Sequence, residues 1–139
     1  MTHIKLTHDS TTYLVNGIGV AVAGNVNLFN KPLANGTDIA EIQTQSYNNP
    51  NYSISGIHFT GVAGSLTYAA LLSMYKNKYD GSNPIYLEVQ YGDSDNLVGA
   101  DGTTTSIPVV VSSFTFPIST SDSRKGYMPV ASLNLTETK

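Results

Sequence analysis

Three alternating segments fill the last third of the chain and constrain its fold more than any other feature. They read PIYLEVQYG from residue 84, SIPVVVSSFTFPI from residue 106 and GYMPVASLNLTET from residue 126. Apolar and polar residues alternate along each segment, as in β-strands with one buried face. The last segment runs almost to the final residue, so we expect it to pair within a sheet, in its own subunit or with a neighbouring one. Chemically reactive groups are scarce on all three.

The first half of the sequence adds further extended segments. We expect strands at 2–8, along 13–29, within 37–47 and at 52–60. Glycine and alanine alternate with larger apolar residues between positions 17 and 23, which indicates a face approached closely by another backbone or a helix. The apolar parity of 52–60 switches at Gly56, which predicts a β-bulge there.

One segment, about 65–79, has the spacing of a helix. Ser65 is the expected N-cap, and Gly81 followed by Pro84 ends the helical pattern. We expect its buried stripe to consist of Tyr68, Leu71, Leu72, Tyr75 and Tyr79. The order of elements therefore predicts a single domain, 1–139, of mainly β (α+β) class: a twisted sheet, a sandwich or a small β-barrel with one flanking helix.

The composition excludes several classes of function. The 139 residues contain no cysteine, which rules out disulfides and thiolate sites, and a net charge of −3 without a basic block argues against sequence-specific nucleic-acid binding. Only 12% of residues are charged, about half the usual share, as expected for surfaces that pack against other subunits. The polar N-terminus and short apolar runs predict neither a signal peptide nor a membrane span.

A polar loop at 92–105 separates two of the strong strands. It carries Asp93, Asp95, Asn96 and Asp101. Such oxygen ligands could bind a hard cation, but the ligand set of an EF-hand is incomplete because its final glutamate is missing. We favour a solvated hairpin loop and predict that it acts as an inter-subunit arm, without a metal.

Catalytic patterns are weak in this sequence. Glu41 and Glu88 lie mid-strand, where a pair of carboxylates could hydrolyse a glycoside, but there is no tryptophan to stack a sugar. There is no nucleophile elbow of the GxSxG type, and the glycine-rich turn before Ser65 lacks the lysine of a phosphate-binding loop. We therefore expect no enzyme and no cofactor, with Glu41 and Glu88 facing solvent or a solvated lumen.

The layout resembles the tail-tube proteins of tailed viruses and related contractile injection systems. The resemblance covers most of the chain: strands before one helix at 65–78, a strand at 84–92, a long polar loop, and two long strands ending in SLNLTET. It implies a small β-barrel or sandwich with a flanking helix. It also implies a virion tail protein, assembled in the host cytoplasm with other tail proteins. Its copies would form rings, typically hexamers, stacked into a hollow tube through which DNA passes without sequence-specific binding.

In that family the inner strands of adjacent subunits join into one lumen wall, and on this basis we expect 84–138 to provide the edges that hold subunits together. Ring closure would protect such exposed edges. The rival hypothesis is a stand-alone β-sandwich that binds a receptor or glycan on a virion or cell surface, although the lack of tryptophan argues against sugar binding.

Overall fold

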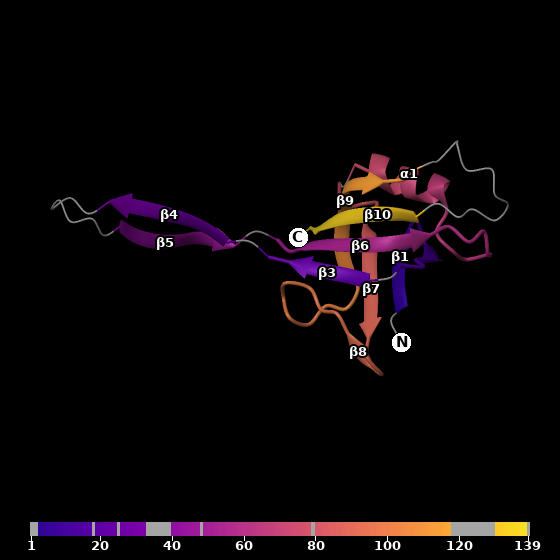
Figure 1. Cartoon of the computed structure of the whole chain (residues 1–139), viewed down its shortest axis with the longest axis horizontal. Helices are drawn as coiled ribbons and strands as arrows, with labels where there is room; N and C mark the ends of the chain where they lie inside the picture. Colours follow the sequence, from indigo (N-terminus) through magenta and orange to yellow (C-terminus); the bar gives the residue numbers. More distant parts are fainter. Residues whose placement is uncertain are drawn as a thin grey trace.

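The polypeptide forms a curled antiparallel sheet with a helix packed against it (Figure 1). The structure is a computed structural model and describes residues 3–17, 19–24, 26–32, 40–47, 49–78, 80–117 and 130–138, with the backbone alone at 26–32 and 40–47. The elements are β1 His3–His8, β2 Thr11–Leu14, β3 Gly19–Ala23, β4 Val26–Pro32, β5 Ala40–Tyr47, β6 Asn51–His58, α1 Tyr68–Lys76, β7 Ile85–Tyr91, β8 Asp95–Asn96, β9 Ile107–Thr115 and β10 Val130–Glu137.

The main sheet has the strand order β2-β1-β7-β9-β10-β6-β3, and β8 pairs with β7. This confirms a mainly β fold with one short helix among the described residues. The sheet is not closed into a barrel, because β2 and β3 lie at opposite ends of the strand order.

Strand β9 turns the corner between the two halves of the sheet. Its first residues pair with β7 at Ile107–Val109, and its later residues pair with β10 as far as Thr115. A register shift between Asn134 and Leu135 accompanies this change of partner, as expected where a strand passes from one packed layer to another. Figure 1 shows the resulting arrangement, with β10 and β6 crossing β7.

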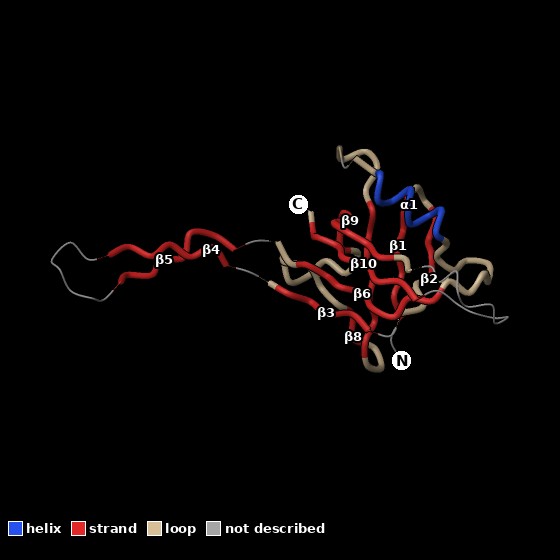
Figure 2. Tube along the Cα trace, turned by 45° about the horizontal axis from the view of Figure 1, so that its top comes forward, coloured by secondary structure: helices blue, strands red, loops and turns tan. Residues whose placement is uncertain are grey.

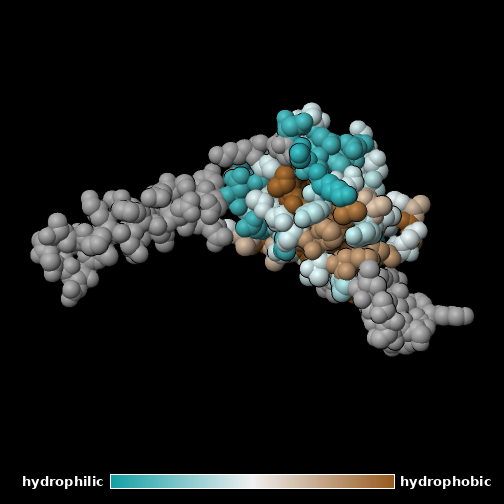
Figure 3. All heavy atoms as spheres, turned by 90° about the horizontal axis from the view of Figure 1, so that it is seen from above, coloured by the Kyte–Doolittle hydropathy of each residue, from teal (hydrophilic) through white to brown (hydrophobic). Residues whose placement is uncertain are grey.

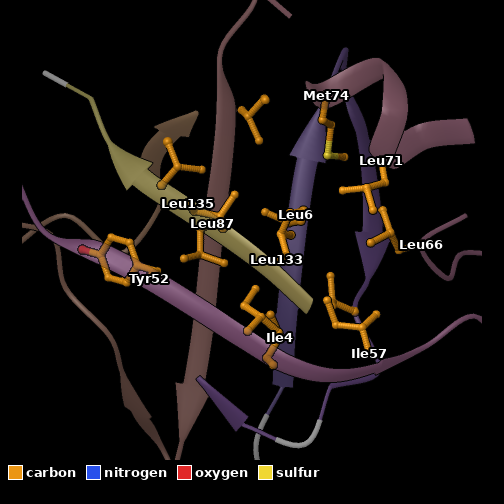
Figure 4. Close-up of a cluster of buried hydrophobic side chains, with 14 of the residues drawn as sticks. Ile4, Leu6, Tyr52, Ile57, Leu66, Leu71, Met74, Leu87, Leu133 and Leu135 are labelled. Atoms are coloured by element: carbon orange, nitrogen blue, oxygen red, sulfur yellow. The ribbon is translucent and has the colours of Figure 1, made fainter. Parts of the chain in front are cut away.

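The core lies between these two halves and is closed at one end by α1 (Figure 4). Alternate residues of β1, β7 and β10 are buried in it, and the side chains labelled in the figure come from β1, β6, β7, β10 and the helix region. Tyr52 lies at the end of the core away from Leu71 and Met74, with its hydroxyl directed outward. The largest fully buried side chains are Tyr52, Ile4, Leu6, Ile54, Ile57, Leu71, Met74, Ile85, Leu87, Ile107, Leu133 and Leu135.

Gly56 and the glycines at 17 and 19 test two predictions about the backbone. Gly56 has φ of 65° and lies where β6 advances one residue further than β10, so the predicted bulge is confirmed. At Gly17 an added Cβ would lie 3.0 Å from Ile54 Cγ2 and 3.3 Å from the Ser55 carbonyl oxygen. The predicted close approach is therefore confirmed at Gly17, but it is wrong at Gly19, whose surroundings are open.

The helix is shorter than predicted and begins later. Thr67, not Ser65, is the N-cap, and its hydroxyl accepts a hydrogen bond from the Ala70 N–H at 3.2 Å. The reason is tertiary: Ser65 forms a parallel bridge with Leu14 of β2, and the Leu66 N–H donates to the Leu14 carbonyl at 2.9 Å. The helix ends at Lys76, where Asn77 adopts an extended conformation.

The buried stripe of α1 also differs from the predicted one. Leu71 and Met74 are buried, whereas Tyr68 and Tyr75 are 42% and 48% exposed. A phenol can lie at the rim of a core with its hydroxyl in water, so the shorter aliphatic residues take the buried positions. Tyr79 lies outside the described residues.

The extended segment predicted at 13–29 is divided among three strands. The chain leaves β2, bends past Gly17 and returns as β3, and then continues as β4. The bulky face predicted on this segment is only partly buried in β3: Val20 packs against the core, whereas Val22 is 51% exposed. Strands β4 and β5 pair only with each other in a two-stranded sheet, and Figures 1 and 2 show this hairpin projecting away from the main sheet.

The last three long strands lie inside the strand order of the main sheet, so they are not its outermost strands. That residues 84–138 hold subunits together stays a prediction. β7 pairs with β1 and β9, β9 pairs with β7 and β10, and β10 pairs with β9 and β6. The outermost strands, β2 and β3, come from the N-terminal half, while β8 pairs only with β7, and β9 beyond Val109 pairs only with β10, among the described strands.

Candidate assembly surface

Strand β3 is the uncovered edge of the main sheet. One side of it pairs with β6, from Gly19 opposite Ser55 to Ala23 opposite Asn51, and no other described strand pairs with its outer side. Its sequence, GVAVA, contains no charged residue and no proline. Natural edge strands usually carry such residues to prevent pairing with other chains, and β3 lacks this protection.

The opposite end of the sheet is partly covered. Beyond β2, the Leu14 N–H donates to the Gly64 carbonyl at 2.8 Å, and the Leu66 N–H donates to the Leu14 carbonyl at 2.9 Å. These bonds block one end of the β2 edge with the protein's own backbone. The contrast makes β3 the better candidate for contact with another molecule.

An apolar groove lies beside β3. Val20 and Val22 form one wall, and Val89 and Tyr91 of β7 with Leu97 form the other, around a volume of about 300 Å³. Tyr91 is 47% exposed, although its parity in β7 matches that of buried residues. An extended segment that paired with β3 would therefore find apolar side-chain contacts in the groove, which is the arrangement of strand addition.

The predicted inter-subunit loop begins at the end of this groove. A turn at 92–94 leads into β8, which pairs back on β7 with Asp95 opposite Tyr91 and Asn96 opposite Gln90. Asp93, Asp95 and Asn96 are all exposed at this tip. The structure thus brings three of the four predicted residues together on one hairpin, and their role in subunit contact stays a prediction.

Asp101, the fourth residue, organises the second half of the loop. Its carboxylate accepts hydrogen bonds from the Thr104 hydroxyl and from the N–H groups of Thr103 at 3.0 Å and Thr104 at 2.9 Å. These donors, with the Thr104 hydroxyl the largest influence, lower the pKa of Asp101 to about 2. Asp101 is therefore a turn-capping carboxylate at neutral pH.

The loop is fastened to the main sheet by Glu137, at the end of β10. This side chain is 8% exposed, and both carboxylate oxygens accept from the Ala100 N–H at 3.1 Å. The Tyr52 hydroxyl donates to Oε1 at 3.0 Å. Burial of Tyr52, reinforced by the hydrogen bond to Glu137 and its charge, raises the pKa of that phenol far above its usual range, so it remains a donor.

Glu137 was missed as a functional candidate in the sequence, although a signal was present. It has the same parity as Leu133 and Leu135, and all three are buried. A carboxylate in register with a buried apolar face must find donors inside the protein. Glu137 therefore lies on the buried face of its strand, whereas Glu88 lies on the exposed face of β7.

The two glutamates predicted to face solvent or a lumen lie in different parts of the fold. Glu88 is exposed on β7, opposite Lys5 of β1, and accepts a hydrogen bond from the Ser106 hydroxyl at 2.6 Å. Glu41 belongs to β5 in the projecting hairpin, and its side chain lies outside the description. The structure does not bring the two strands that carry them into one cleft, so it gives no support to the hypothesis of a glycosidase site.

A cluster of aromatic rings lies where α1 meets β9. Tyr68 stacks on Phe116 with ring centroids 4.8 Å apart, and Tyr75 meets Phe114 edge-on at 5.0 Å. Phe59 contacts Phe116 at 5.1 Å. Figure 3 shows that hydrophobic and hydrophilic areas lie side by side on the face seen from above.

Within the described ranges, no three histidine or acidic side chains come together as metal ligands. No helix in the same ranges is long and apolar enough to cross a membrane.

Comparison with known proteins gives a likeness of fold. No protein-family model matches the sequence, and no curated protein matches it. The chain is similar to one in a solved structure described as the cryo-EM structure of the anti-feeding prophage (AFP) baseplate, 6-fold symmetrised. The TM-score is 0.60 at 5% sequence identity, and the match covers 99% of this chain and 89% of the other. At this identity the likeness establishes a shared fold.

Proposed function

We propose that this protein is a structural subunit of a phage-like particle, the tail of a virus or a contractile injection system. The observation that carries the proposal is the fold shared with a baseplate chain over 99% of this sequence. A likeness of that extent includes the projecting hairpin as well as the main sheet. A structural role, without catalysis or a cofactor, also accords with the scarcity of catalytic groups.

Within this class we favour self-assembly into rings that stack as a hollow tail tube. A free edge at β3 gives each copy a surface that another copy can extend. Pairing unlike surfaces of successive copies produces a ring when the rotation closes and a filament when it does not. The neighbouring structure was treated with six-fold symmetry, so we take six as the expected number of subunits.

The same hypothesis assigns a role to the charge of the protein. A tube that conducts DNA must not bind phosphate strongly, and the net charge of −3 without a basic block meets this requirement. Glu88 is exposed on β7 and is our candidate for a lumen-facing acid, together with Glu41 on the hairpin. The partners would be further copies of this chain, other tail proteins and DNA in transit.

Light scattering coupled to size exclusion tests this proposal on the purified protein. One chain has a mass of 14.8 kDa, so a sixfold multiple, or larger stacked species, is the expected result. A monomer at all accessible concentrations would contradict self-assembly.

The alternative is a binding module for a receptor or a glycan. The specific observation in its favour is the half-exposed pair Tyr68 and Tyr75, since tyrosine gives a large, rigid contact surface. A monomer that loses ligand binding when both are replaced by alanine would support this alternative.

A further inference from the structure

We propose that Glu137 couples the loop at 97–104 to the root of the β4–β5 hairpin, so that a change in either segment loosens the other. The coupling stands on the contacts of Glu137 alone. Its use in assembly, as a way of linking two projecting segments of one subunit, rests on the proposed function.

On the loop side, the carboxylate is packed directly against backbone. The Ala100 N–H lies 3.1 Å from each carboxylate oxygen. A Cβ added to Gly99 would lie 2.8 Å from Oε1, closer than real Cβ atoms come to other heavy atoms. A side chain at residue 99 would therefore force the Glu137 carboxylate to move.

On the hairpin side, three contacts hold the same residue. The Tyr52 hydroxyl donates to Oε1 at 3.0 Å. The Asn49 side-chain amide donates to the Glu137 carbonyl at 3.0 Å, and the Glu137 N–H donates to the Pro50 carbonyl at 3.0 Å. Asn49 and Pro50 connect β5 to β6, so these bonds fix the point from which the hairpin projects.

The burial of Glu137 makes these contacts interdependent. At 8% exposure the carboxylate relies on Ala100 and Tyr52 as donors, and an ionised group that loses a buried donor tends to move toward water. A depression of about 440 Å³ adjoins Glu137, lined by residues from both segments, including Asn49, Ala100 and Asp101. The side chain can therefore swing outward without repacking the core, and in doing so it breaks the bond from Tyr52 as well.

Gly99→Ala tests this coupling from the loop side, by hydrogen exchange measured with mass spectrometry. The new methyl group collides with Glu137, so we expect exchange to accelerate about tenfold, the effect of losing one hydrogen bond to a charged group, in peptides covering 49–53 and 134–138. Gly102→Ala is the matched control: Gly102 has φ of +76° and no atom within 4 Å of an added Cβ. It strains the same loop without touching Glu137, and its effect should stay within 97–105.

Tyr52→Phe tests the coupling from the other side and keeps the buried ring. We expect faster exchange at 97–104, because the Tyr52 hydroxyl is linked to that loop through Glu137, which also binds the Ala100 N–H. All variants are compared in the same oligomeric state, which light scattering verifies. If the protein forms no rings, the proposed function is contradicted, but the comparison of exchange rates among the variants still tests the coupling. Effects confined to 97–105 in Gly99→Ala, or an unchanged 97–104 in Tyr52→Phe, would overturn the coupling.

Discussion

Two residues one helical turn apart anchor α1, and the tyrosines beside them lie at the surface. Leu71 and Met74 are buried, while Tyr68 stacks on Phe116 from a half-exposed position. The free energy of unfolding should therefore respond very differently to truncation at neighbouring positions of one helix.

Leu71→Ala should lower the free energy of unfolding by about 2–5 kcal/mol, because it leaves a cavity in a fully buried site. Tyr68→Ala removes a ring from a site that is 42% exposed and loses mainly its aromatic contact, worth about 0.5–1.5 kcal/mol. Urea denaturation of the two variants provides the comparison. Equal losses would show that Tyr68 is a core residue after all.

The loop turn at Asp101 should depend on pH. Its pKa is lowered to about 2 in the folded protein, so the turn is stabilised fully above the unfolded value of about 3.9. That contribution is lost as the pH falls through about 2. Amide exchange at Thr103 and Thr104, corrected for intrinsic rates, should accelerate in this range, and Asp101→Ala should remove the pH dependence. A variant with an unchanged profile would exclude Asp101 as the cause.

At the scale of elements, the local sequence pattern predicted the positions of strands well, but it did not predict which strands lie next to one another. The alternation of buried and exposed residues in β1, β7 and β10 and the bulge at Gly56 depend on adjacent residues, so they could be predicted from the sequence. The predicted start of α1 at Ser65 was wrong because the backbone at 64–66 is hydrogen-bonded to β2, and this contact joins distant parts of the chain. Strand order is likewise non-local, which is why the interior position of the C-terminal strands was not foreseen.

The same limit applied to the assembly surface. An exposed loop carrying Asp93, Asp95 and Asn96 could be predicted from polarity and turn chemistry, and its role in subunit contact stays a prediction. The edge at β3 could not be predicted, because an uncharged strand becomes an edge only when the strand order leaves it without a partner. Glu137 lay between these cases. Its position on the buried face of β10 could be read from the sequence, but its hydrogen-bond donors, Ala100 and Tyr52, come from distant segments.

Val22→Lys should weaken assembly while leaving the subunit folded. It places a charge on the open edge at a side chain that is 51% exposed, so it obstructs strand addition with little effect on stability. Val62→Lys is the matched control, since Val62 is 65% exposed and lies outside the strands. Light scattering should show a smaller mass for the first variant only. Identical masses for both would exclude the β3 edge as a subunit contact.

The tip of the β7–β8 hairpin makes a separate prediction. If it is the inter-subunit arm, the double change Asp93→Lys and Asp95→Lys should lower the apparent mass of the assembly by reversing the charge at the contact. Both side chains are exposed, so thermal unfolding of the monomer should change little. Normal assembly of this variant would show that the arm contacts nothing.

The molecule combines a sheet whose β3 edge has no partner among the described strands with a hairpin that projects from it (Figure 1). A monomer of this kind exposes a strand that natural proteins usually protect. Assembly into a closed ring would cover the β3 edge in every copy, and stacking of rings would give the projecting hairpin a surface to contact. The proposed assembly would therefore account for both the open edge and the projecting hairpin.

Negative-stain electron microscopy of the purified protein tests this account most directly. We expect rings with a central opening, or tubes formed by their stacking, and we expect Val22→Lys to abolish both. Images that show only single small particles, at concentrations where the protein remains folded, would contradict the assembly on which the account rests.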